Sequence, residues 1–218
     1  MRYDTIIFDF DGTLADSSES IIKTIEETLH ILGYKLKDKQ KARELIGIPL
    51  AKTFRTLAGL EGEELNTAIK EYRSKYLQIA LGSIKLFPKV KNTLNLLYNR
   101  GIKLAIASNR GSEVLNQLLK NFVITDLFKV VVGEQDVSHM KPNPEAVFRI
   151  LDKLKTTPHR TLVVGDTVDD IEMGSRAKCD TCAVSYGNSP LDQLKASSPN
   201  FIIDNISQLL QELKINYE

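Results

Sequence analysis

The stretch TIIFDFDGT, residues 5–13, joins a short apolar run directly to two carboxylates. Residues 5–8 have the length and composition of a buried parallel strand. Asp9 and Asp11 follow at positions i and i+2, so both carboxylates leave the strand on the same side. Two neighbouring carboxylates at the end of a buried strand are costly unless a cation offsets their charge. The stretch therefore predicts a strand that ends in a functional site.

Four further apolar runs have the same strand-like character. They cover residues 103–107, 129–132, 161–164 and 181–184. Segments with helical periodicity separate most of them, including residues 90–97 and residues 114–122. Strands that alternate with helices predict the α/β class, with a doubly wound parallel sheet as the core.

Residues 9–102 contain no strand signal, and this separation is far longer than an ordinary crossover. We expect an inserted, all-helical cap at residues 15–83, with the catalytic core formed by residues 1–14 and 84–218. Asp16 should be the N-cap of the first helix, and Gly82 with Ser83 should form the return hinge. The helical segments expected in the cap are residues 16–33, 39–45, 50–57 and 63–81.

The composition is that of an ordinary globular protein. The 218 residues include 29 Lys and Arg against 28 Asp and Glu, and 42% are hydrophobic. A formal net charge of +1 gives no general field for nucleic acid or for an anionic membrane, so anion recognition should be local. No segment is apolar enough for a signal peptide or a transmembrane helix. We expect a soluble cytoplasmic protein, a monomer or a homodimer, that binds neither nucleic acid nor membrane.

Polar side chains also stand where the other predicted strands end. The second strand is followed by Ser108, Asn109 and Arg110, the third by Lys141 and the fourth by Asp166. Because the carboxyl ends of parallel strands meet at one edge of a sheet, these side chains should converge with the carboxylates of the first strand. A hydroxyl, a lysine and several carboxylates form a set suited to phosphoryl transfer.

Each of these residues has an ordinary explanation when it is taken alone. Ser108 could cap a helix, and Lys141 could be a solvated charge. Asp169 and Asp170 could be acids that favour the first turn of a helix. Because all of them follow predicted strands, their joint occurrence favours a shared functional site over these separate structural roles.

Four motifs stand in order along the chain: DFDGTLADS at residues 9–17, IASN at 106–109, KPNPE at 141–145 and VGDTVDD at 164–170. In these motifs the chain resembles the haloacid dehalogenase superfamily, and within it the phosphoglycolate-phosphatase-like hydrolases. The resemblance spans the whole chain. It implies a Rossmann-like core, a helical cap inserted after the first strand, and Mg²⁺-dependent phosphatase chemistry through an aspartyl-phosphate.

The resemblance also implies roles for the residues of the motifs. Asp9 is implied as the nucleophile, and Asp11 as the general acid and base. Charge neutralisation by Mg²⁺ would keep the anionic nucleophile from repelling an anionic substrate. The implied phosphate contacts are Ser108 and Lys141. Independently of the resemblance, Gly12 and Thr13 should turn the chain close around a small anion, and Asn109 is a further candidate contact. The implied metal ligands are Asp9, Asp11, Asp166 and, directly or through water, Asp170.

Cations are frequent in the predicted cap between residues 35 and 43. Most of them should form a solvated helix face. Arg43 is the candidate in this run for a contact with the leaving group of a substrate, and Lys52 and Arg55 are further candidates. Arg110 is the corresponding candidate in the core.

Cys179 and Cys182 form a C-x-x-C sequence. The chain has no second cysteine pair for a zinc site, and a redox pair belongs at the start of a helix rather than before an apolar strand. We expect two reduced, buried thiols. His139 is close to Lys141 in sequence, and a position on a surface loop is the better expectation for it.

The leading interpretation is a Mg²⁺-dependent phosphatase for a small metabolite, with a phosphoglycolate-like phosphomonoester as the first choice. Pyrophosphate is close behind. A sugar phosphomutase would use the same aspartyl-phosphate, and a non-catalytic phosphate-binding protein would lack catalytic positions that are all present here. A response-regulator receiver carries similar residues at its strand ends, but it is too short for this chain and lacks the large insertion.

Overall fold

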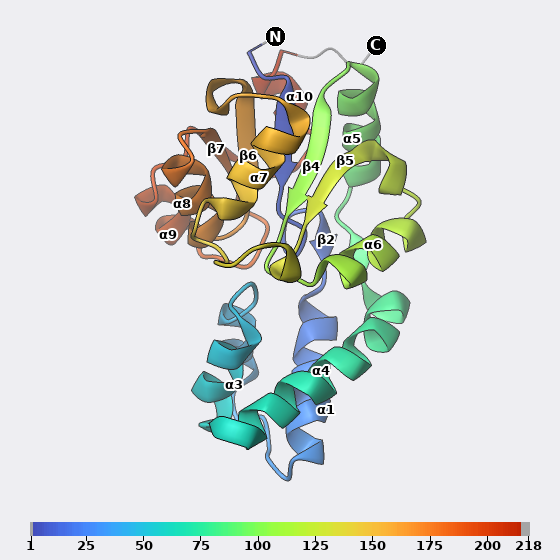
Figure 1. Cartoon of the computed structure of the whole chain (residues 1–218), viewed down its shortest axis with the longest axis vertical. Helices are drawn as coiled ribbons and strands as arrows, with labels where there is room; N and C mark the ends of the chain where they lie inside the picture. Colours follow the sequence, from blue (N-terminus) through green and yellow to red (C-terminus); the bar gives the residue numbers. More distant parts are fainter. Residues whose placement is uncertain (1, 215–218) are drawn as a thin grey trace. The chain divides into compact units, whose positions relative to one another are not determined.

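The computed structural model describes residues 2–214 (Figure 1). The chain divides into two compact units. The core contains Met1–Ala15 and Leu86–Glu218, and the helical unit contains Asp16–Lys85. The sequence analysis divided the chain after residues 14 and 83. Across residues 2–214, no helix combines the length and the apolar character that a membrane span requires.

The core is built on a six-stranded sheet with parallel neighbours. Its order is β5-β4-β1-β6-β7-β8. The strands are β1 (Thr5–Phe8), β4 (Lys103–Ala107), β5 (Phe128–Val132), β6 (Thr161–Gly165), β7 (Asp180–Val184) and β8 (Phe201–Ile203). The predicted α/β class with a parallel sheet is confirmed. The edge strand β8 was not predicted, because its apolar run is only three residues long and one residue of the three is buried.

The central position of β1 explains why its sequence is continuously apolar. β1 lies between β4 and β6, with Phe8 opposite both Ile106 and Val164. All four residues of β1 are buried. At the next position the backbone N–H of Asp9 donates to Val164 O at 2.9 Å, and Ser108 leaves β4 with a similar bond to the neighbouring strand. These bonds bring both residues to the same edge of the sheet.

Helices cover the sheet. One core cluster joins Ile7 and Val163 of the sheet to Val147 and Met173, which belong to α7 (Glu145–Leu154) and α8 (Val168–Arg176). Ile6 and Phe8 point to the opposite face and are also fully buried, so both faces of β1 are covered. The remaining helices of the core are α5 (Val90–Asn99), α6 (Ser112–Asn121), α9 (Leu191–Ala196), α10 (Gln208–Glu212) and the 3₁₀ turns η1 (Thr125–Leu127), η2 (Glu134–Asp136) and η3 (Pro158–Arg160).

The helical unit contains α1 (Ser18–Ile31), α2 (Lys39–Glu44), α3 (Leu50–Ala58) and α4 (Gly62–Ser83). Its mostly aliphatic interior includes an aromatic cluster: Tyr72 stacks on Tyr76 with ring centroids 5.5 Å apart, and Phe54 meets Tyr72 edge-on at 6.1 Å. Two details differ from the sequence expectation. Ser17 rather than Asp16 occupies the N-cap position of α1, but its side chain makes no capping bond, and it is Asp16 Oδ1 that accepts from the N–H and the hydroxyl of Ser18. Gly82 and Ser83 lie within the last turn of α4 rather than in a hinge.

Two short strands mark the places where the chain passes between the two units. β2 (Ala15–Asp16) and β3 (Lys85–Leu86) pair as a two-stranded sheet. The N–H of Phe87 also donates to Leu14 O at 3.0 Å. Strands of two residues are too short to produce a periodic signal, so the sequence pattern missed them.

Candidate active site

The predicted site residues of the core lie beyond the carboxyl ends of β1, β4 and β6 and in the loop between β5 and α7. All of the ionisable ones are removed from water to an unusual degree. The relative exposure of Asp9, Asp11, Lys141, Asp166 and Asp170 is 8%, 9%, 9%, 0% and 1%. Buried charges need partners, so the contacts among these residues decide what the site can do.

Lys141 joins the end of β1 to the start of α8. Its Nζ donates to Asp9 Oδ1 and to Asp170 Oδ1, both at 2.5 Å. Burial alone would lower the pKa of Lys141, but the charges of Asp170 and Asp9 raise the pKa above its ordinary value. Two carboxylates therefore favour the charged form of Lys141, and Lys141 is a buried residue of the site rather than a solvated surface charge.

Asp166 is held by hydrogen bonds from three donors. Thr13 Oγ1 donates to Oδ1 at 2.9 Å, while the backbone N–H and the side-chain amide of Asn188 donate to Oδ2 at 2.8 and 2.9 Å. Gly12 makes this close approach possible. Its φ of +87° lies in the left-handed region, and a Cβ at this position would lie 2.1 Å from Asp166 Oδ2.

Asp170 is held at the start of α8 by a capping box. The backbone N–H of Asp170 donates a hydrogen bond to the side chain of Thr167. In return, Asp170 Oδ2 accepts from the backbone N–H of Thr167 at 3.0 Å and from its hydroxyl at 2.6 Å. Oδ1 then faces Lys141. Asp170 therefore acts both as a helix-capping acid and as a part of the site.

The carboxylates of Asp9, Asp166 and Asp170 can together hold a metal ion. Each offers an oxygen, and these three oxygens lie within 4.8 Å of one another. Burial raises the pKa of Asp9 well above its ordinary value, and the charges of Asp170 and Asp166 add to this effect while Lys141 opposes it. Burial and the charge of Asp170 raise the pKa of Asp166 to about 7. The cluster is thus short of positive charge, and carboxylate oxygens suit a hard divalent cation.

Asp11 has a different partner. Arg110 Nε donates to Asp11 Oδ2 at 2.7 Å, and Arg110 Nη2 donates to Asp11 Oδ1 at 2.8 Å. Both side chains are about nine-tenths buried, with relative exposures of 9% and 10%. The side chain of Asp11 therefore lies in a bidentate ion pair, while its backbone O is 3.4 Å from Asn188 Nδ2.

Ser108 and Asn109 follow β4, as the sequence placed them. Ser108 is buried, and its hydroxyl oxygen accepts from the N–H of Arg110 at 3.3 Å. Asn109 Oδ1 accepts from the backbone N–H of Lys141 at 3.0 Å. Asn109 thus connects the end of β4 to the loop that carries the lysine. Ser108 is not a helix N-cap, because α6 begins at Ser112 with Gly111 in that position.

Several residues singled out in the sequence lie elsewhere. Arg43 belongs to the helical unit, where it donates to Ser18 Oγ at 3.2 Å and to Glu19 Oε1 at 2.6 Å. Cys179 and Cys182 are buried free thiols, and burial raises the pKa of both. Three others are exposed: Lys52, Arg55, which pairs with Glu61, and His139.

Asn188 and Tyr186 are the contributors that the sequence analysis missed. Asn188 supplies two of the hydrogen bonds to Asp166, and Tyr186 Oη donates to Thr13 O at 2.8 Å. Both follow β7, the strand next to β6. Extending the search for polar residues at strand ends to this fifth strand would have found Asn188.

Comparison with known proteins identifies relatives along nearly the whole chain. The family model of haloacid dehalogenase-like hydrolases matches residues 6–184. Probable phosphatase IndB of Dickeya dadantii is 32% identical over 209 residues, which cover 94% of this chain and 91% of that protein. Pyrophosphatase PpaX of Oceanobacillus iheyensis is 31% identical over 210 residues, which cover 96% of each.

Solved structures share the same fold. A haloacid dehalogenase-like hydrolase from Bacteroides fragilis superimposes with a TM-score of 0.89 at 31% identity, over 95% of this chain and 99% of its own. A predicted phosphoglycolate phosphatase from Haemophilus somnus 129PT gives a TM-score of 0.90 at 25% identity, over 98% and 99%. The structural relatives therefore include the cap as well as the core.

The carboxylate cluster predicts that Mg²⁺ stabilises the folded protein. At about 100 times its dissociation constant, a ligand that binds only the native state adds ~2.7 kcal/mol. The rise in Tm on replacing EDTA with Mg²⁺ should be larger at about pH 8 than at about pH 5.5, because Asp166 has a pKa of about 7 and must lose its proton to bind the ion. Thermal denaturation at the two pH values measures this difference.

Two variants test the same prediction. Asp166→Asn should abolish most of the Mg²⁺-dependent rise in Tm. Asp169→Asn should retain it, because Asp169 is adjacent in sequence but is not a member of the three-carboxylate cluster. An equal rise in Tm at both pH values, or a full rise in Asp166→Asn, would show that the ion binds elsewhere.

Proposed function

Because the chain belongs to the haloacid dehalogenase-like hydrolase family and is a phosphatase, we propose that it hydrolyses a small phosphorylated metabolite through an aspartyl-phosphate on Asp9. One observation carries this proposal: Lys141 binds both Asp9 and Asp170, next to Asp166. A carboxylate nucleophile and a fixed cation then lie side by side. This arrangement suits attack on an anionic phosphoryl group.

In the first step, a carboxylate oxygen of Asp9 forms a bond to phosphorus as the bond between phosphorus and the leaving oxygen breaks. The electron pair of the broken bond stays on the leaving oxygen, which takes a proton from Asp11. Lys141 Nζ and the Ser108 hydroxyl donate hydrogen bonds to the phosphoryl oxygens. Lys141 needs little reorganisation for this task, because two carboxylates already hold it in place.

In the second step, water attacks the phosphorus of the aspartyl-phosphate. Asp11 accepts the proton that the water loses, and the bond between phosphorus and the Asp9 oxygen breaks. Inorganic phosphate leaves, and Asp9 is again a carboxylate. The same side chain thus acts as an acid in one step and as a base in the next. Asp11 must gain and lose this proton while Arg110 remains close to its carboxylate.

Asp9, Asp166 and Asp170, with the backbone oxygen of Asp11, are the groups that would hold Mg²⁺. When bound, the ion would neutralise charge on the phosphoryl group and on the carboxylates. The chain prepares these ligands in advance. Thr13 and Asn188 orient Asp166, and Thr167 orients Asp170.

A phosphoglycolate-like phosphomonoester is the first candidate substrate, and pyrophosphate is the second. The first is supported by the fold shared with the Haemophilus somnus protein, and the second by the name of the Oceanobacillus iheyensis relative. Both molecules carry a second anionic group beyond the phosphoryl group that is transferred. A buried guanidinium next to the general acid suits such a group, so we assign Arg110 as its contact. Arg43 of the helical unit stays a second proposed contact.

The two acids of the first motif should separate in a burst experiment with p-nitrophenyl phosphate. Nitrophenolate leaves readily without a proton, so Asp11→Asn should retain the first step and lose most of the second. The expected record is a burst of about one nitrophenolate per active site, followed by turnover that is slower by roughly 10²–10⁴-fold. Asp9→Asn should give no burst, because an amide is a poor nucleophile.

Asp169→Asn is the matched control for the burst experiment and should turn over at the native rate. A native steady-state rate in Asp11→Asn, or a burst in Asp9→Asn, would mean that the nucleophile and the base have been assigned wrongly.

Arg110→Gln tests the substrate class. Loss of the guanidinium should reduce kcat/KM for pyrophosphate and phosphoglycolate about tenfold more than for phenyl phosphate, whose leaving group carries no second anion before reaction. The ratio of the three kcat/KM values in variant and native enzyme measures this preference. An equal loss on all three substrates would show that Arg110 only positions Asp11 and does not read the leaving group.

A further inference from the structure

The KPNPE motif ends in a carboxylate that the proposed reaction does not use. Glu145 is the first residue of α7, directly after the motif's second proline. Its side chain contacts residues outside the helix. Oε1 and Oε2 both accept from the backbone N–H of Ser138 at 3.0 Å, and Oε2 accepts from the N–H of His139 at 2.9 Å. Glu145 therefore binds the loop that precedes Lys141.

This pattern is more than the usual attraction between an acid and a helix N-terminus. Ser138 and His139 lie seven and six residues before Glu145, outside the helix. Arg149, one turn further along α7, binds Glu145 Oε1 through Nε at 3.0 Å and through Nη2 at 2.7 Å. The N–H of Ser138, Arg149 and the N–H of His139 together lower the pKa of Glu145 to about 2, so this acceptor is ionised across the working pH range.

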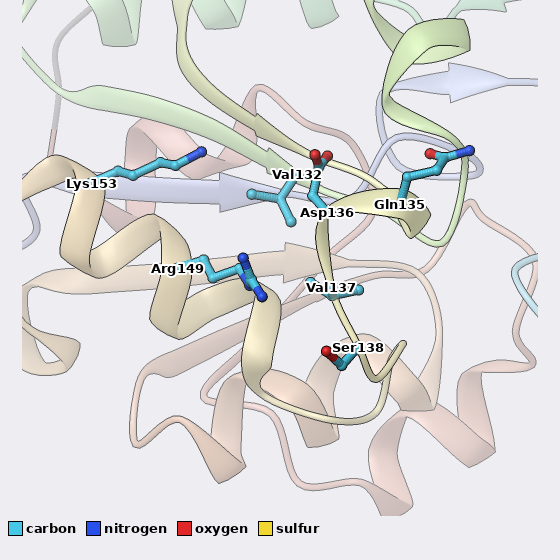
Figure 2. A pocket seen from close by; sticks show the side chains of 7 residues that line it. All are labelled: Val132, Gln135, Asp136, Val137, Ser138, Arg149 and Lys153. Carbon is cyan, nitrogen blue, oxygen red and sulfur yellow. The ribbon is translucent and has the colours of Figure 1, made fainter.

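Val137 at the start of this loop packs against the hydrophobic cluster of the core, but the turn that follows it is exposed. Ser138 and His139 are exposed, whereas Lys141, only two residues further on, is buried. A cavity of about 360 Å³ lies beside the loop, and Figure 2 shows Ser138 and Arg149 among the side chains that line it. At Ser138 and His139 the backbone borders open space, so the hydrogen bonds to Glu145 hold this turn in addition to the packing of Val137.

Lys141 receives its position from three directions. Glu145 holds the backbone that precedes Lys141, and Asn109 Oδ1 accepts from the backbone N–H of Lys141 at 3.0 Å. Arg176 Nη1 donates to the carbonyl of Pro142, the next residue, at 3.2 Å. The bonds from Asn109 and Arg176 act at or after the lysine. Loss of the Glu145 contacts would release the segment on the side that faces the cavity.

We propose that Glu145 is a positioning residue for Lys141: its carboxylate fixes the exposed turn at Ser138 and His139, and thereby keeps the lysine Nζ between Asp9 and Asp170. This inference rests on the proposed function, because Lys141 matters only if it binds the phosphoryl group. Glu145 touches neither a reacting atom nor a metal ligand. Its effect on catalysis must pass through the loop.

Glu145→Gln is the test variant, because glutamine keeps the shape but has one acceptor oxygen and a donor NH₂ that cannot accept from the loop. Amide exchange at Ser138 and His139, followed by mass spectrometry, should be faster in the variant. A lysine displaced by about 1 Å should reduce kcat/KM by about 10- to 100-fold, and the inhibition constant of inorganic phosphate should rise by a similar factor. The Tm should stay within a few degrees of the native value.

Two further variants identify the route of the effect. Asp152→Asn removes an exposed carboxylate from the same helix, away from the cavity, and should leave exchange, activity and phosphate inhibition unchanged. In a Lys141→Gln background, adding Glu145→Gln should cause no further loss of activity, because the residue through which it acts is already absent.

Three outcomes overturn the inference and leave the proposed function intact. Native kcat/KM in Glu145→Gln would show that the loop needs no anchor, and the same fold-loss in the Lys141→Gln background would show that Glu145 acts by another route. Unchanged exchange at Ser138 and His139 would show that the contacts do not hold the turn. Native protein without any phosphatase activity would instead overturn the proposed function, and the inference with it.

Discussion

The buried cation of Lys141 is what makes a cluster of buried carboxylates tolerable. Asp9, Asp166 and Asp170 are buried, and Asp9 and Asp170 share this single ammonium group. Removing one partner from a buried pair leaves the other uncompensated, at a cost of about 3–5 kcal/mol. The carboxylates nevertheless exceed the cation in charge, which favours a divalent ion. The need for charge balance thus links the fold to phosphoryl chemistry.

The sheet order makes this balance possible with residues that are distant in the sequence. β1 lies between β4 and β6, so Asp9, Ser108 and Asp166 emerge from three adjacent strands. Lys141 comes from the loop before α7, and its ion pair with Asp170 ties this loop to α8. Surrounding hydrogen bonds then fix each charge. Different segments of the chain thus hold the charged groups of the site in place.

The sequence predicted those parts of the site that neighbouring residues in the chain make recognisable. Apolar runs in the sequence predict the strands, and the polar residues that follow these runs, Asp9, Ser108 and Asp166, predict the site. The bidentate pair of Arg110 with Asp11 and the bonds from Asn188 to Asp166 connect residues 99 and 22 positions apart. No periodicity reports such contacts, because they depend on which strands become neighbours.

The most direct test of the account is to identify the residue that carries the phosphoryl group during turnover. Enzyme that is quenched with acid in the presence of substrate and Mg²⁺ can be reduced with borohydride, which converts an aspartyl-phosphate to homoserine. Peptide mass spectrometry should then find homoserine at Asp9, dependent on substrate and absent when substrate is omitted. Conversion at another aspartate, or an unmodified Asp9 in enzyme that was turning over, would contradict the account.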